Sequence, residues 1–186
     1  GGGSVAALAG ALSAALASMV AALTYGNPKL EQHHKAAAEV GVELKRISEV
    51  TARAVTDDTV AFKKVIAAYR EKKSLPADEA GRGIESAYRG AVEVPLQVAR
   101  SMSRLLELAV EIGPYIQRSA ISDLAVSAHL AHAGLHGAAW NIKINLDEMK
   151  EVEAVSRIKS ELEGIISTAE LKFSEAIEIA AGRMKG

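Results

Sequence analysis

The chain has 186 residues, a length that favours a single domain over residues 1–186. Its 22 basic and 23 acidic residues leave a net charge of −1, which gives no reason to expect a nucleic acid or an anionic membrane as a partner. The absence of Cys excludes disulfides, thiolate zinc sites and Cys nucleophiles. Hydrophobic residues make up 49% of the chain but aromatic residues only 4%, so the core must be built from small aliphatic side chains, as in closely packed helices.

The N-terminal part contains a long stretch without charge. Gly1-Gly2-Gly3-Ser4 has the composition of a flexible linker, and residues 5–23 then run without Asp, Glu, Lys or Arg. A segment that spans a bilayer needs about 20 apolar residues, so this one is long enough. Ala is only weakly apolar, however, and no Lys or Arg flanks the segment as in a stop-transfer pattern. We therefore expect an Ala-rich helix buried on all sides in a bundle, and no membrane as a partner.

Two signals divide the middle of the chain into separate helices. Thr56 followed by Asp57 and Asp58 predicts the N-cap and acidic first turn of a new helix. Another helix covers about 79–92, and Pro95 predicts a kink or a restart.

The second half of the chain continues the helical pattern. Ser122-Asp123 opens a helix that runs to about Asn145, and the last helix carries apolar residues at spacings of three and four over residues 152–180. This apolar seam can pack against other helices of the same chain or against a second subunit. Because the second possibility gives a partner to the seam, we expect a homodimer. The prediction for the whole chain is an all-α up-and-down bundle of about six or seven helices, one of them the buried Ala-rich helix.

Three histidines lie on one helix face. His129, His132 and His136 have the spacing i, i+3 and i+7, and neighbouring turns can present two imidazoles together. The outer pair is about 10 Å apart along the helix, too far to share a zinc ion, and no HExxH motif accompanies them. We therefore expect a partly exposed helix face and no metal.

Two asparagines one turn apart mark another face of the same helix. Asn141 and Asn145 continue a face that carries Gly137 and Gly134. Two amides beside two missing side chains could admit a flat ligand that forms hydrogen bonds at its edge. The same pattern is also typical of close helix packing at the glycines, and both interpretations stay open.

Aspartates at predicted helix starts allow two interpretations as well. Asp123, Asp57 and Asp58 each fit a capping position. A carboxylate beside a cationic substrate centre could instead act as a general base or stabilise charge. Spacing does not separate the two.

Six short blocks, taken in order, resemble the cyclodeaminase/cyclohydrolase family. That family includes the cyclodeaminase domain of formiminotransferase–cyclodeaminase and the stand-alone methenyltetrahydrofolate cyclohydrolases. The blocks are Gly1-Gly2-Gly3-Ser4-Val5-Ala6-Ala7, Leu23-Thr24-Tyr25-Gly26, Asp58-x-x-Ala61-Phe62, Val94-Pro95-Leu96, Ser122-Asp123-Leu124 and Asn141-x-x-x-Asn145-Leu146.

The resemblance implies a cytoplasmic enzyme that acts on the one-carbon unit between N5 and N10 of tetrahydrofolate. The first expectation is a formiminotetrahydrofolate cyclodeaminase, which releases ammonia and yields 5,10-methenyltetrahydrofolate. The alternative within the family is a methenyltetrahydrofolate cyclohydrolase, which yields 10-formyltetrahydrofolate. The folate is the substrate, and no metal or redox cofactor is implied.

The resemblance also implies roles for individual residues. Asp123 would be the general acid or base, and Asp58 would stabilise charge or act as a second base. Lys29 would meet the glutamate tail of the folate. The remaining substrate-binding residues implied are Gly2, Gly3 and Ser4, as backbone donors in a loop, with Tyr25, Ser122, Asn141 and Asn145.

The sequence departs from the family pattern at several places, and two of these departures bear on function. Residues 117–121 replace a stretch that is often Gly-Asn-x-Asn, and the basic residues after Tyr25-Gly26 are reduced to Lys29. These departures favour the competing hypothesis of a catalytically silent helical binding or dimerisation module that keeps the fold.

Overall fold

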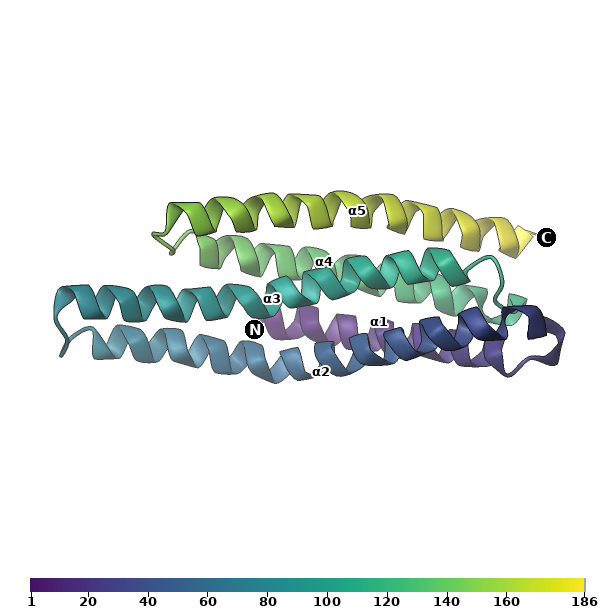
Figure 1. The fold of residues 1–186 in the computed structure, drawn as a ribbon, viewed down its shortest axis with the longest axis horizontal. Coiled ribbons are helices and arrows are strands. Elements are labelled where there is room, and N and C mark those ends of the chain that lie inside the picture. The colour runs from purple at the N-terminus through teal and green to yellow at the C-terminus, as the bar shows by residue number, and fades with distance from the viewer. Residues whose placement is uncertain (186) are drawn as a thin grey trace.

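The protein is a bundle of long helices that run alternately up and down along one axis (Figure 1). The computed structural model describes residues 1–185, and the side chains of residues 1–184. Over that range the chain forms five α-helices, joined by short turns of which two are 3-10 helices, Pro28–His33 and Arg118–Ala120. The α-helices are α1 (Gly2–Tyr25), α2 (His34–Glu71), α3 (Ala77–Ile112), α4 (Ile121–Leu146) and α5 (Val152–Lys185).

Close contact between α1 and α4 organises the core. A Cβ at Gly134 would lie 3.1 Å from the backbone oxygen of Ala6, so the two helices approach nearly backbone to backbone. Two buried serines bond across the same contact: Ser13 Oγ donates to the carbonyl of Ser127 at 2.8 Å, and Ser127 Oγ donates to the carbonyl of Ser13 at 3.0 Å. Because these hydroxyls satisfy each other's backbone, the polar pair is compatible with full burial.

The opposite side of α1 is exposed. The prediction of burial on all sides is therefore wrong: α1 packs its small residues against the bundle and leaves a stripe of larger apolar residues uncovered. Those residues are Val5, Leu8, Leu12, Met19 and Leu23, each more than 40% exposed. By length and composition alone α1 could cross a membrane, but 44% of its most apolar window is buried within the fold.

The expected count of six or seven helices is too high, because two predicted boundaries lie inside continuous helices. Asp57 and Asp58 lie within α2, so Thr56 is not an N-cap. Pro95 lies buried within α3, which continues on both sides of it. At both places tertiary packing outweighs the local signal.

The bend between α4 and α5 is fastened to α3. The carboxylate of Glu85 accepts the backbone N–H groups of Lys150, at 2.8 Å, and Glu151, at 3.3 Å. Arg89 pairs with the side chain of Glu151. These contacts hold the turn between α4 and α5 against α3.

We predict that a side chain at Gly134 destabilises the bundle. Gly134→Val forces the α1 backbone away from α4 and should lower the free energy of unfolding by about 1–3 kcal/mol in urea titrations. Gly164→Val is the control, because a Cβ at Gly164 meets no atom within 4 Å and Val is a slightly better helix former than Gly. Equal stability of the two variants would contradict the close contact.

Candidate active site

A pocket of about 440 Å³ lies where the first turn of α1 meets α2, α3 and the end of α4. Its volume falls in the range of small-molecule sites. Its wall combines apolar groups with several polar side chains from different helices. The lining residues are Gly1, Gly2, Asp58, Thr59, Phe62, Val65, Tyr88, Ala91, Asn141, Ile144, Asn145 and Glu148.

The carboxylate of Asp58 is held against the start of α1. Ser4 Oγ donates to Asp58 Oδ2 at 2.7 Å. A Cβ at Gly3 would lie 2.1 Å from Asp58 Oδ1, so only glycine allows the carboxylate to reach this position. Gly2, Gly3 and Ser4 form the first turn of α1 and not the expected loop, yet N–H groups in a first turn have no intrahelical acceptor and can still serve as donors.

Both asparagines are anchored to backbone carbonyls. Asn141 Nδ2 donates to the carbonyl of Gly137 at 2.8 Å, and Asn145 Nδ2 donates to the carbonyl of Ala91 at 3.0 Å. A Cβ at Gly2 would lie 3.1 Å from Asn141 Nδ2, so the α1 backbone touches this amide. Each amide is thereby fixed in orientation, and its oxygen can accept a hydrogen bond from a ligand.

Pro95 explains why the carbonyl of Ala91 receives a side chain. In an α-helix this carbonyl would accept the N–H of the residue four positions later, and that residue is Pro95, which has none. Asn145 supplies the missing donor from α4. The proline thus does not break α3, because a side chain from a neighbouring helix compensates for the lost bond.

Two aromatic rings line the pocket. Tyr88 lies partly buried on α3, and burial raises the pKa of Tyr88 to about 12, with Tyr69 beside it adding to the effect. The Tyr88 hydroxyl therefore stays protonated at neutral pH. Phe62 on α2 is 63% exposed although it is a large apolar ring, as expected for a wall that a flat ligand would cover.

Four predicted site residues lie elsewhere in the chain. Asp123 is 18 positions before Asn141 on α4, which corresponds to about 27 Å along the helix. Ser122 lies beside it in the first turn, while Tyr25 ends α1 and Lys29 is exposed in the turn that follows. Within one chain the structure therefore separates Asp123, Ser122, Tyr25 and Lys29 from Asp58 and the asparagines.

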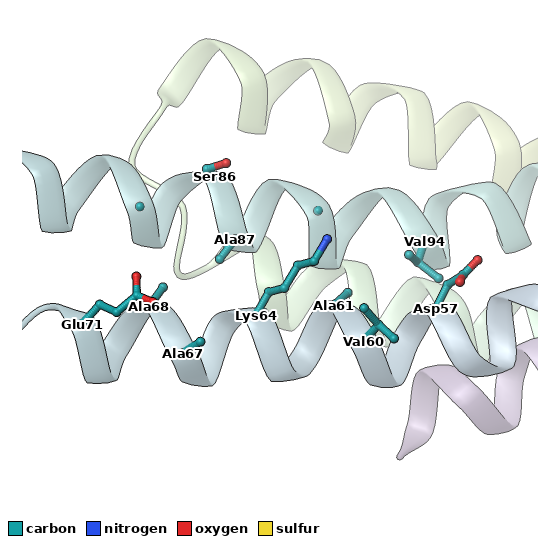
Figure 2. A pocket seen from close by; sticks show the side chains of 12 residues that line it. Asp57, Val60, Ala61, Lys64, Ala67, Ala68, Glu71, Ser86, Ala87 and Val94 are labelled. Atoms are coloured by element: carbon teal, nitrogen blue, oxygen red, sulfur yellow. The ribbon is translucent and has the colours of Figure 1, made fainter.

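A larger hollow, of about 570 Å³, lies between α2 and α3 (Figure 2). Its charged groups are Asp57, Lys64 and Glu71, each seven positions from the next and so about 10 Å apart. Figure 2 shows Lys64 reaching from α2 toward α3, with Asp57 farther along the groove. Because these charges do not converge, we place the candidate active site in the smaller pocket.

Comparison with known proteins identifies the family. A sequence model described as formiminotransferase-cyclodeaminase matches residues 1–164. The chain belongs to that family.

Individual relatives agree with this assignment. The chain is 34% identical to the methenyltetrahydrofolate cyclohydrolase of Methylorubrum extorquens, over 91% of this chain and 82% of that protein. It is 34% identical to the formimidoyltransferase-cyclodeaminase of Rattus norvegicus, over 81% of this chain but only 28% of that longer protein. The crystal structure of formiminotetrahydrofolate cyclodeaminase from Thermotoga maritima superposes with a TM-score of 0.89, at 25% identity, over 98% of this chain and 88% of that one.

Three polar residues of the pocket were missed by sequence reasoning. Thr59, Tyr88 and Glu148 come from α2, α3 and the turn after α4. Thr59 adjoins Asp58 and could have been included with it. Tyr88 and Glu148 carry no spacing signal, because only the packing of α3 against the end of α4 brings them together.

We predict that Pro95 and Asn145 are energetically coupled through the carbonyl of Ala91. Asn145→Ala leaves that part-buried carbonyl without a donor and should cost about 1–3 kcal/mol of stability. In a Pro95→Ala background the restored N–H can bond to the carbonyl, so the same substitution should cost less. A double-mutant cycle in urea measures the difference, and additive effects would contradict the coupling.

Proposed function

We propose that this protein is a formiminotetrahydrofolate cyclodeaminase whose active site is the pocket around Asp58. The observation that carries the proposal is the carboxylate of Asp58, fixed by Ser4 and Gly3 beside two anchored amides, in a chain of this family. A carboxylate in this place can take a proton and stabilise a neighbouring cation, which are the two demands of the reaction.

The pocket suits the pterin end of the substrate. A pterin is flat and presents alternating donors and acceptors along one edge. The anchored amides of Asn141 and Asn145 can pair with that edge, while Phe62 and Tyr88 offer rings to its faces. N–H groups in the first turn of α1 provide further donors at a helix N-terminus.

The proposed reaction joins N10 to the formimino carbon that N5 carries. The lone pair of N10 attacks that carbon, and the resulting tetrahedral carbon is bonded to N5, N10 and the former imino nitrogen. Asp58 accepts the proton that N10 loses. The formimino group reacts as its amidinium ion, so its nitrogen already carries two hydrogens. That nitrogen takes the proton held by Asp58 and leaves as ammonia, and the positive charge that remains is shared by N5 and N10. The carboxylate of Asp58 then stabilises this cation of 5,10-methenyltetrahydrofolate.

A second candidate is the cyclohydrolase reaction, in which water adds to the methenyl carbon. It is favoured by the similarity to the Methylorubrum extorquens cyclohydrolase, which extends over 82% of that protein. Asp58 would in that case take a proton from the attacking water. The bond between the carbon and N5 would then break as the hydroxyl loses its proton and N5 gains one, which leaves 10-formyltetrahydrofolate. Both reactions pass through a tetrahedral carbon between two nitrogens, so one site can serve either.

The absorbance of the methenyl chromophore tests the proposal. We expect it to rise after the protein is mixed with 5-formiminotetrahydrofolate, faster than in buffer alone. Asp58→Asn removes the base and should lower the rate about 10²–10⁴-fold. Asp57→Asn is the matched control, because Asp57 lines the other hollow and should leave the rate unchanged.

Other results would redirect or end the proposal. A flat trace with the formimino substrate, together with accelerated decay of added methenyltetrahydrofolate, would indicate the cyclohydrolase. No change in either assay would favour the silent module. Asp123→Asn should leave the rate within a few-fold of the wild type, since Asp123 is about 27 Å from Asn141 along α4. A loss as large as that of Asp58→Asn would require Asp123 to come from a second copy.

We also propose that the protein is a homodimer in which the exposed stripe of α1 packs on a second copy. α1 carries no charged residue. Ile144 is exposed and lies seven residues after Gly137, so it projects from nearly the same side of α4. That is the side that faces α1, because Gly137 packs on Ala6. A self-complementary two-fold contact is the usual way to cover such a patch. An antiparallel contact centred midway between Val5 and Leu23 would place the partner subunit's Tyr25 opposite Gly3, at the pocket.

We predict that a charge in the stripe separates the dimer. Leu12→Glu should give a particle of one chain's mass by light scattering, where the wild type has twice that mass, with unchanged helical circular dichroism. Leu171→Glu on α5 is the control, because Leu171 is 70% exposed and lies outside the stripe. A wild type with the mass of one chain would overturn the dimer without affecting the assignment of Asp58.

A further inference from the structure

We propose that His132, His136 and Glu170 form a binding site for a divalent transition metal ion, Zn²⁺ being the best fit, on the surface shared by α4 and α5. The two imidazoles come from successive turns of α4, and the carboxylate comes from α5. One ligand atom from each of the three residues lies within 4.8 Å of the other two.

The three side chains already converge on one point. His132 Nε2 lies 3.1 Å from both oxygens of Glu170, and His136 Nε2 lies 2.7 Å from Oε1. Donors of a tetrahedral zinc ion, each about 2.0–2.1 Å from the metal, are about 3.4 Å apart. An ionised carboxylate only accepts hydrogen bonds, so each Nε2 carries a proton in this cluster. Small side-chain rotations, together with loss of both Nε2 protons or their transfer to Nδ1, turn the hydrogen-bonded cluster into a set of three ligands.

The kinds of donor select the class of ion. Two imidazoles and one carboxylate suit Zn²⁺ and neighbouring transition metals, whereas Ca²⁺ and Mg²⁺ prefer oxygen ligands alone. The argument that excluded a site shared by His129 and His136 does not apply here, because His132 and His136 are one turn apart. Glu170, which the sequence does not point to, supplies the third ligand.

The cluster is supported from one side and open on the other. The ring of Phe173 stacks on His132 with centroids 4.3 Å apart, which restricts the orientation of that imidazole. The side chains of His132 and His136 are 28% and 39% exposed, so an ion can enter from solvent and keep a water ligand.

Glu170 has no partner among the Lys and Arg side chains that the structure describes. Its ion pairs are with the two histidines alone. A metal ion would therefore not have to displace a Lys or Arg cation from this carboxylate.

The site is separate from the pocket around Asp58. His136 and Asn141 are five residues apart on α4, which turns their side chains about 140° from each other. Glu170 also lies beyond residues 1–164, the part of the chain that the family model matches. A metal here would fasten α5 to α4, so its expected effect is on stability and not on folate chemistry.

Titration with zinc chloride, on protein freed of any polyhistidine tag, tests the site. We expect one equivalent to bind in calorimetry and to raise the Tm, because an ion that binds only the folded state stabilises it. His136→Gln and Glu170→Gln should each weaken binding at least about tenfold and abolish the rise in Tm. His129→Gln is the matched control, since His129 lies on the same helix but outside the cluster.

Cobalt provides a second measurement that does not depend on stability. Co²⁺ bound by two imidazoles and a carboxylate should give visible absorption bands, which His136→Gln should remove and His129→Gln should leave in place. Circular dichroism without metal checks that the variants are folded. The proposal is overturned if zinc does not bind at about 100 times the protein concentration. It is also overturned if folded His136→Gln and Glu170→Gln bind zinc as tightly as the wild type.

Discussion

The close approach of α1 and α4 is the contact on which the rest of the structure depends. It requires positions without side chains, Gly134 and Gly137 on α4, facing Ala6 on α1. Because the two backbones are so near, the first turn of α1 reaches both Asn141 and Asp58. Larger residues at the contact would separate the helices and move the first turn of α1 away from Asn141 and Asp58. Packing density here is thus a condition for the shape of the candidate active site as well as for stability.

Much of the architecture could be predicted from the sequence, and the errors have physical causes. Helical periodicity identified the bundle and the start of α4 near Ser122. The two wrong boundaries, at Thr56 and Pro95, came from local signals, because both residues favour helix ends. In the bundle, α2 gains more by continuing along its neighbours, and α3 tolerates its proline through Asn145. The exposed face of α1 was missed because its residues are apolar on every side, which makes a covered face and an uncovered one look alike.

The candidate site was only partly accessible to sequence reasoning. Asn141 and Asn145 could be grouped because one helix carries both, and Gly3 and Ser4 because they are neighbours in sequence. That Asp58 joins them depends on how far α2 extends along α1, which no local pattern encodes. Within one chain Asp123 does not lie beside them, because α4 places it about 27 Å from Asn141 along the helix axis.

The proline in α3 has a consequence for how the pocket can vary. In the interior of an unbroken helix each carbonyl accepts a backbone N–H, so the helix presents only its side chains to a ligand or a neighbouring helix. Mutation can exchange those side chains. Removing one amide hydrogen at Pro95 creates a fixed attachment point in the main chain itself, at Ala91. The orientation of the Asn145 amide is therefore set by a main-chain carbonyl. Side chains around it can diversify for new substrates while the anchor of this amide stays where it is.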